Sequence, residues 1–179
     1  MTPAHTHSQV EPPSAWVLRC AAIVERGPVL DVACGSGRHA RLFASRGREV
    51  VAVDREAQSI EGVRFVQADL EDGRPWPFAG ERFGCIVVAN YLHRPLFRPL
   101  EDALADGGVL IYETFMTGNE RYGRPSNPAF LLQPYELLIA FARLNTLAFE
   151  QGYVEQPKPA MVQRLCAVRG NIDGVRIPP

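Results

Sequence analysis

Residues 29–40 read VLDVACGSGRHA, an apolar run that breaks into a glycine-containing turn and then opens a helix. Gly35 and Gly37 carry no Cβ, so the backbone of this turn can approach a bound molecule closely. The N–H groups at the start of the following helix have no partner within that helix and point into the same space. This order of strand, glycine turn and helix predicts a loop that binds a nucleotide-containing cofactor.

The charge of Asp31 distinguishes between such cofactors. Asp31 lies inside the apolar run, where burying a carboxylate is costly unless the carboxylate is paired. A carboxylate at this place repels the pyrophosphate of a dinucleotide, whereas it attracts the sulfonium and ammonium groups of S-adenosylmethionine. The sequence therefore favours S-adenosylmethionine as the cofactor.

Length and composition predict one globular domain. The chain has 179 residues, of which 46% are hydrophobic and 22% are charged, typical of a domain with a full core. The first 13 residues are polar and contain prolines, and we expect a flexible N-terminal tail over 1–13 and a single domain over 14–179. A secretory signal or membrane span is not apparent, which predicts a cytoplasmic protein without a membrane partner.

Charge and cysteine usage argue against several other classes. The net charge is -1 and there is no basic run, which argues against a nucleic-acid partner. The four cysteines are scattered without a CxxC pair, so neither a zinc site nor a disulfide framework is expected. We therefore expect no metal in the site.

Strands and helices alternate along the rest of the chain. Strands are expected from Val29 and at residues 50–54, 63–67, 83–89, 109–112, 146–150 and 162–168. Helices are expected from the glycine turn to Arg46, at 95–104 and at 134–144, after an amphipathic stretch at 15–25 with Trp16, Leu18, Ile23 and Val24 inward. This alternation predicts an α/β fold with a doubly wound, mostly parallel sheet.

Polar residues follow the strands at the edge where such sheets bind ligands. They are the loop from Asp31 to Gly37, and then Asp54, Asp69, Asn90 and Glu113. The carboxyl ends of parallel strands meet at one edge, so these residues are expected to surround one crevice.

With these motifs, the chain resembles the class I S-adenosylmethionine-dependent methyltransferases. The family's first motif, an acidic residue followed by a glycine-rich loop, is spelled here Asp31-Val32-Ala33-Cys34-Gly35-Ser36-Gly37. Ala33 replaces the first glycine of that motif, and the link after Asp54 is too short for the usual crossover helix. The resemblance covers roughly residues 29–168 and implies a seven-stranded sheet whose last strand is antiparallel. Among the branches of this family, the chain is similar to small bacterial methyltransferase-domain proteins, including those of tellurite resistance.

The resemblance implies a role for each residue at the cofactor site. Asp31 would face the cofactor's amino group directly or through water, Asp54 would accept from the ribose hydroxyls, and Asp69 would accept from the adenine amine, with Glu71 and Asp72 as alternatives. The implied cofactor-binding residues are Asp31, Ala33, Cys34, Gly35, Gly37, Asp54, Arg55, Asp69, Leu70 and Asn90.

Methyl transfer depends mainly on positioning donor and acceptor, and it needs a base only where the acceptor must lose a proton. His93, just after the fourth strand, is the candidate base, unless it only hydrogen-bonds locally at the start of a helix. The resemblance implies that Tyr91 lies beside the methyl group. Glu113 is a candidate for binding a cationic acceptor, and a structural salt bridge is the alternative.

The connection over residues 114–132 is long for a compact domain, which is typical of a binding loop or lid. Arg121, Tyr122 and Arg124 in this segment suit an anionic or planar acceptor. The short chain and the near-neutral charge favour a small-molecule acceptor.

Two other functions stay open from the sequence. Residues 35–40 also satisfy the GxGxxG/A pattern of NAD(P)-dependent oxidoreductases, although Asp31 and Asp69 speak against a dinucleotide. The other alternative is a methyltransferase fold that binds the cofactor without turnover.

Overall fold

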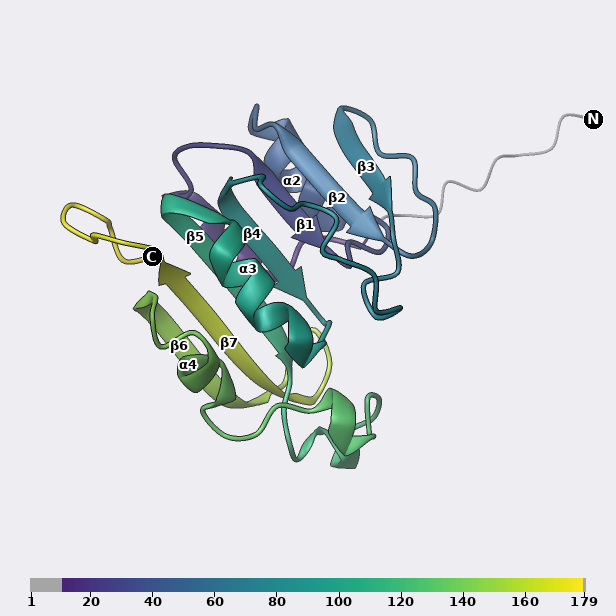
Figure 1. Ribbon diagram of the computed structural model, residues 1–179. Coiled ribbons are helices and arrows are strands. Elements are labelled where there is room, and N and C mark those ends of the chain that lie inside the picture. Colours follow the sequence, from purple (N-terminus) through teal and green to yellow (C-terminus); the bar gives the residue numbers. More distant parts are fainter. Residues whose placement is uncertain (1–10, 179) are drawn as a thin grey trace, which may run out of the picture.

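A seven-stranded sheet runs through the centre of the protein in the computed structural model, which describes residues 11–178 (Figure 1). The spatial order of the strands is β3-β2-β1-β4-β5-β7-β6. Their bounds are β1 (Val29–Val32), β2 (Val50–Asp54), β3 (Val63–Gln67), β4 (Phe83–Ala89), β5 (Leu104–Phe115), β6 (Asn145–Val154) and β7 (Ala160–Val168).

The sheet is parallel except for its last strand. Neighbouring strands among β1 to β5 pair in parallel, whereas β7 pairs antiparallel with both β5 and β6. In Figure 1 the arrowhead of β7 accordingly points opposite to those of β2 and β3. The predicted fold class, a mostly parallel seven-stranded sheet with an antiparallel last strand, is therefore confirmed.

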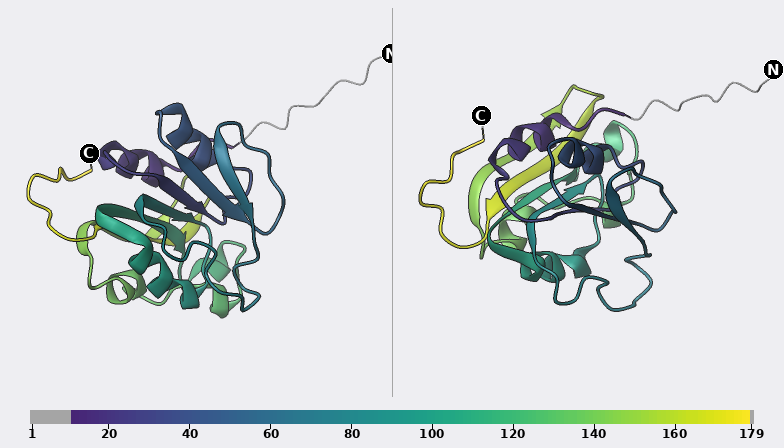
Figure 2. Two further views of the ribbon diagram at one scale, coloured as in Figure 1. Left: turned by 45° about the horizontal axis from the view of Figure 1, so that its top comes forward. Right: turned by 90° about the horizontal axis from the view of Figure 1, so that it is seen from above.

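Helices cover both faces of the sheet (Figure 2). The helices α1 (Ala15–Cys20) and α2 (Arg38–Ser45) pack on one face, and α3 (Phe97–Ala103) and α4 (Glu136–Ala140) pack on the other. Buried residues form two cores, one on each face, so the central strands are apolar on both sides. The link between β2 and β3 contains no helix, as the sequence predicted.

The helices are shorter than expected. The stretch predicted as one helix over 95–104 begins with a 3₁₀ turn at Arg94–Leu96 and continues as α3, and the helix predicted over 134–144 is reduced to α4. Tyr135 has a φ of 63°, outside the right-handed helical region, so α4 cannot start earlier. The expectation that Leu18 faces inward is wrong: its side chain is 40% exposed, because α1 buries Trp16, Val17 and Cys20 instead.

Most of the predicted N-terminal tail over 1–13 lies outside the described residues. Within the described part, the Glu11 carboxylate lies 3.2 Å from Nη1 of Arg38, and the carbonyl of Pro12 accepts from the same nitrogen. Among residues 11–178, no helix is long and apolar enough to cross a membrane.

Candidate functional site

The glycine turn after β1 has a backbone that ordinary residues rarely adopt. Ala33, Gly35 and Gly37 have φ angles of 52°, 52° and 77°, all in the left-handed region. A Cβ at Gly37 would collide with the Ile60 side chain, whereas a Cβ at Gly35 would meet no atom within 4 Å. The backbone at Gly35 therefore borders open space, which fits a loop that a ligand approaches closely.

Asp54, at the end of β2, fixes this turn. Its Oδ2 accepts from the N–H of Gly35 at 2.8 Å, and its Oδ1 accepts from the N–H of Glu56 at 3.0 Å. Each carboxylate oxygen can accept a second hydrogen bond. The Asp54 carboxylate is therefore oriented by the backbone and can still accept hydrogen bonds from hydroxyl groups of a ligand.

Asp31 lies beneath the loop. Its side chain is 1% exposed, and its Oδ2 accepts from the N–H of Ala40 in the first turn of α2 at 2.8 Å. Burial raises the pKa of Asp31 to about 7. This carboxylate holds the start of α2 against the loop, and its contact with the cofactor's amino group, direct or through water, stays a prediction.

A cavity of about 500 Å³ lies at the carboxyl ends of β1, β2, β3 and β4. Its volume is in the range of small-molecule sites. The lining residues are Ala33, Asp54, Arg55, Glu56, Ala68, Asp69, Leu70, Glu71, Tyr91 and Phe130. The structure thus brings together half of the predicted cofactor residues, Ala33, Asp54, Arg55, Asp69 and Leu70, with Tyr91 from the catalytic candidates.

The remaining predicted cofactor residues lie around the cavity rather than on its lining. Asp31 is buried below it, and Gly35 and Gly37 belong to the turn. Cys34 is buried, and burial raises the pKa of its thiol to about 12, so it stays uncharged. Asn90 is exposed just after β4, with a φ of 58°, and its N–H donates to the carbonyl of Glu113 at 2.8 Å.

Tyr91 presents its ring at the cavity. The ring is half-buried, and burial raises the pKa of the hydroxyl, an effect that the nearby Glu71 carboxylate reinforces. The hydroxyl of Tyr112 donates to the backbone carbonyl of Tyr91 at 3.0 Å and fixes the chain there. Tyr91 therefore offers a hydrogen-bond donor, not a base.

His93 stands near the cavity but not on its lining. Its side chain is 25% exposed, and its Nδ1 lies 3.9 Å from Oε2 of Glu71, which does line the cavity. It precedes the 3₁₀ turn at Arg94–Leu96 without capping it through its side chain. Contact between His93 and an acceptor stays a prediction.

Glu113 is engaged in an ion pair inside the protein. Its Oε2 lies 2.6 Å from Nε of Arg164 on β7, and the side chain is 8% exposed. Arg164 also contacts Glu150 on β6 at 3.2 Å. Of the two interpretations of Glu113, the structure provides the salt bridge and no free carboxylate for an acceptor.

Replacing Glu113 with Gln tests this assignment. Because Arg164 keeps Glu150, we expect the free energy of unfolding to fall by about 1–2 kcal/mol, less than for a fully buried pair broken outright. Affinity for S-adenosylhomocysteine should not change. Denaturant unfolding and calorimetry measure the two quantities. Unchanged stability together with weakened ligand binding would show that Glu113 takes part in the binding site instead.

The segment 114–132 is tied to the sheet. The N–H of Thr117 donates to the carbonyl of Leu132 at 2.9 Å, and the buried Asn119 side chain bonds Pro125 and the N–H of Met161 in β7. Arg121, Tyr122 and Arg124 do not line the cavity, and the ring of Tyr122 packs on that of Tyr153 at 5.1 Å between centroids. The residue of this segment at the cavity is Phe130, which sequence reasoning missed together with Glu56 and Ala68, whereas Glu71, an alternative to Asp69 in that reasoning, does line the cavity.

The lining is strongly acidic. Asp54, Glu56, Asp69 and Glu71 contribute four carboxylates, and the single cationic side chain is Arg55, which lies 3.6 Å from Glu56. A concave site lined by one sign of charge attracts ligands of the opposite sign. The cavity therefore favours a ligand with positive charge and disfavours a pyrophosphate.

Comparison with known proteins agrees with this chemistry. Residues 29–108 match the family described as Methyltransferase domain. Over 129 residues the chain is 32% identical to the malonyl-[acyl-carrier protein] O-methyltransferase of Pseudescherichia vulneris, a match that covers 64% of this chain and 49% of that protein. The chain thus spans about half the length of this curated relative.

Solved structures share the fold. TehB from Haemophilus influenzae superposes with a TM-score of 0.71 at 17% identity, over 86% of this chain and 61% of that one. The 1,6-didemethyltoxoflavin-N1-methyltransferase of Burkholderia thailandensis, solved with its substrate and S-adenosylhomocysteine, gives a TM-score of 0.61 at 19% identity, over 88% and 79% of the two chains.

The fold, the glycine loop and the domain matched over residues 29–108 are features of the class I S-adenosylmethionine-dependent methyltransferases, which this chain resembles. S-adenosylmethionine is the cofactor of the class. The relatives give no support to a nicotinamide-dependent oxidoreductase. By their names they methylate different acceptors, malonyl-[acyl-carrier protein] on oxygen in one case and 1,6-didemethyltoxoflavin at N1 in another.

Proposed function

We propose that the protein transfers a methyl group from S-adenosylmethionine to a small-molecule acceptor. The observation that carries this proposal is the acidic cavity at the carboxyl ends of β1 to β4, in which the backbone fixes the Asp54 carboxylate beside an open glycine turn. The positive charge of the sulfonium and ammonium groups matches the carboxylates that line the cavity.

The residues present fit this cofactor. Asp54 has free acceptor capacity for ribose hydroxyls, and Asp69 and Leu70 line the same cavity after β3, where they would hold the adenine. The backbone from Ala33 to Gly37 and the exposed Asn90 would hold the methionine portion. Asp31 would act from below, by fixing the start of α2.

The cofactor, when bound, supplies a methyl carbon whose bond to sulfur breaks as the bond to the acceptor forms, leaving S-adenosylhomocysteine. The chain's own contribution is positioning and exclusion of water, which can supply about 7–11 kcal/mol of the barrier. Tyr91 would orient the acceptor through its hydroxyl. His93 would take a proton from an acceptor that must lose one, with Glu71 stabilising the imidazolium.

Calorimetry with S-adenosylhomocysteine and NADH tests this function. We expect micromolar binding of S-adenosylhomocysteine and none of NADH, because the four carboxylates on the cavity lining disfavour a ligand that carries a doubly negative pyrophosphate. Binding of NADH alone would overturn the proposal. Radiolabelled S-adenosylmethionine with cell extract then tests turnover: label in small molecules supports it, and tight cofactor binding without any transfer favours a scaffold protein.

A further inference from the structure

We propose that the end of the cavity between Tyr91 and Phe130 receives the acceptor, and that it takes a flat aromatic molecule that bears an amino group or no charge. A carboxylate or an oxyanion would not suit this end of the cavity. The inference rests on the proposed methyl transfer and adds the chemical class of the acceptor.

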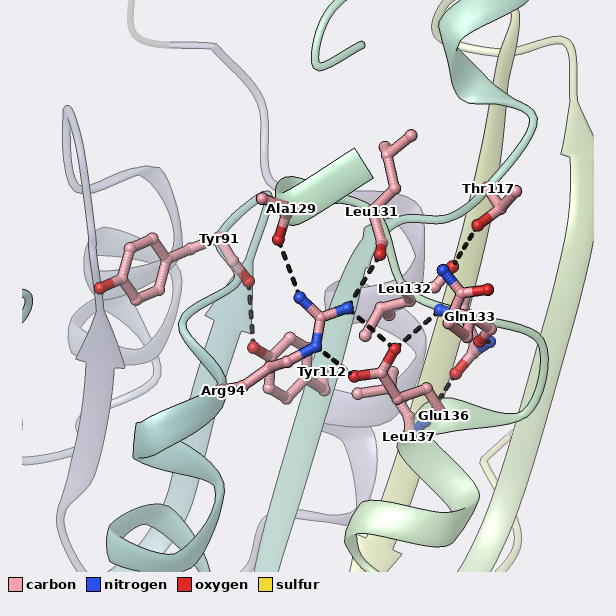
Figure 3. Close-up of polar contacts among 11 residues, drawn as sticks. Tyr91, Arg94, Tyr112, Thr117, Ala129, Leu131, Leu132, Gln133, Glu136 and Leu137 are labelled. Atoms are coloured by element: carbon pink, nitrogen blue, oxygen red, sulfur yellow. Dashed lines mark hydrogen bonds and ion pairs between the residues drawn. The ribbon is translucent and has the colours of Figure 1, made fainter. Parts of the chain in front are cut away.

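Phe130 is an aromatic side chain held at the cavity although 47% of its surface is exposed. Its position is set by its neighbours: Nη1 of Arg94 donates to the carbonyl of Ala129 at 2.8 Å, and Nη2 donates to that of Leu131 at 2.9 Å (Figure 3). One guanidinium thus binds the backbone on both sides of Phe130. These bonds fix the backbone that carries the ring, so Phe130 offers a positioned aromatic surface on the cavity lining that a flat ligand can cover.

Arg94 is itself fixed by Glu136 of α4. Its Nε and Nη2 lie 2.6 Å and 3.0 Å from the two carboxylate oxygens of Glu136, a bidentate pair (Figure 3). Glu136 also accepts from the N–H of Gln133 at 2.7 Å. Paired forks of this kind set the plane of the guanidinium, so Arg94 is a positioning residue for Phe130.

Tyr91 provides the second aromatic wall. Figure 3 shows its ring pointing away from the Arg94 group while its carbonyl is held by Tyr112. Both Tyr91 and Phe130 line the cavity, and Glu71 lines it with them. Aromatic faces attract both flat rings and cations, and a neighbouring carboxylate adds to the attraction for a cation.

The charge distribution excludes an anionic acceptor. The single guanidinium on the lining, Arg55, follows Asp54 at the proposed ribose site and faces Glu56. Arg121 and Arg124, which the sequence analysis named as suited to an anionic or planar acceptor, do not line the cavity. A bound cofactor with a net charge near +1 offsets only part of the negative charge of the four carboxylates. An anionic acceptor would therefore still be repelled.

Two indole probes with the same ring and the same two-carbon chain test this inference. Tryptamine ends in an ammonium group and indole-3-propionate ends in a carboxylate. We expect tryptamine to bind the full chain saturated with S-adenosylhomocysteine at least about tenfold more tightly than indole-3-propionate, as measured by ligand-observed NMR titration.

Variants locate the site. Phe130→Ala should weaken the binding of tryptamine about tenfold. Its affinity for S-adenosylhomocysteine should stay within about twofold of the wild-type value. Arg94→Lys should also weaken tryptamine binding, since lysine cannot form the bidentate pair with Glu136 that positions Arg94. Glu71→Gln should reduce the ratio of the affinity for tryptamine to that for indole-3-propionate, because it removes one negative charge from the lining. Ile139→Ala, which removes a 73% exposed apolar side chain of α4, is the control and should change neither ligand.

Three outcomes would overturn the inference while leaving the proposed function intact: equal or tighter binding of indole-3-propionate, no binding of either indole at millimolar concentration, or unchanged tryptamine binding in Phe130→Ala. Failure of the wild-type protein to bind S-adenosylhomocysteine would instead contradict the proposed function itself. A loss of S-adenosylhomocysteine binding in Arg94→Lys but not in Phe130→Ala would contradict the positioning role of Arg94.

Discussion

Replacing Asp54 with Ala is expected to weaken S-adenosylhomocysteine binding about 100-fold, because it removes acceptors for two ribose hydroxyls, and charge-assisted hydrogen bonds are worth about 1.5–3 kcal/mol each. The same change frees the N–H of Gly35 and the N–H of Glu56, so the turn loses its fixed shape as well. Calorimetric titration measures the affinity.

Asp106→Ala is the matched control for Asp54→Ala. Asp106 is also a carboxylate, it is 99% exposed, and it lies near the amino end of β5, away from the cavity. We expect its affinity for S-adenosylhomocysteine to equal that of the wild type. If Asp54→Ala binds as tightly as Asp106→Ala while both unfold at similar temperatures, the ribose assignment is wrong.

Replacing Asp31 with Asn is expected to change how stability depends on pH. Burial raises the pKa of Asp31 from 3.8 to about 7 in the folded protein, so between these values the folded state holds a proton that the unfolded chain has released. The stability that this proton provides is complete below pH about 4 and is lost as the pH rises through about 7. Asn carries no titrating proton, which removes this loss.

Stability measured at several pH values tests this account of Asp31. As the pH rises from 4 to 8, the free energy of unfolding of Asp31→Asn minus that of the wild type should increase by on the order of 2–4 kcal/mol. Denaturant unfolding at each pH gives both values, and Asp106→Asn serves as an exposed control. A difference that stays constant across this range, or that changes in the opposite direction, would show that Asp31 is not a buried acid of raised pKa.

The sequence predicted the parts of the site that depend on local patterns. The glycine turn, the acidic ends of β2 and β3 and the buried apolar strands each follow from residues close together in the chain. Because these strands are parallel neighbours, their carboxyl ends bring Ala33, Asp54, Asp69 and Leu70 to one cavity. The antiparallel last strand came from the family resemblance instead, because no local pattern distinguishes its direction.

The acceptor end was not predictable in this way. Phe130 reaches the cavity because Arg94, more than 30 residues earlier, binds the carbonyls of Ala129 and Leu131. Glu113 is withdrawn from the site by Arg164, 51 residues later. Such contacts are set by tertiary structure, and the exposed cations of the same segment gave a stronger local signal than a single phenylalanine.

A crystal structure of the full chain with S-adenosylhomocysteine tests the central claim most directly. We predict that the ligand fills the cavity beside the glycine turn, with both ribose hydroxyls within hydrogen-bond distance of the Asp54 carboxylate and the adenine beside Asp69 and Leu70. Crystals grown at saturating ligand that show it bound elsewhere, or that show this cavity closed by the protein's own side chains, would contradict the account.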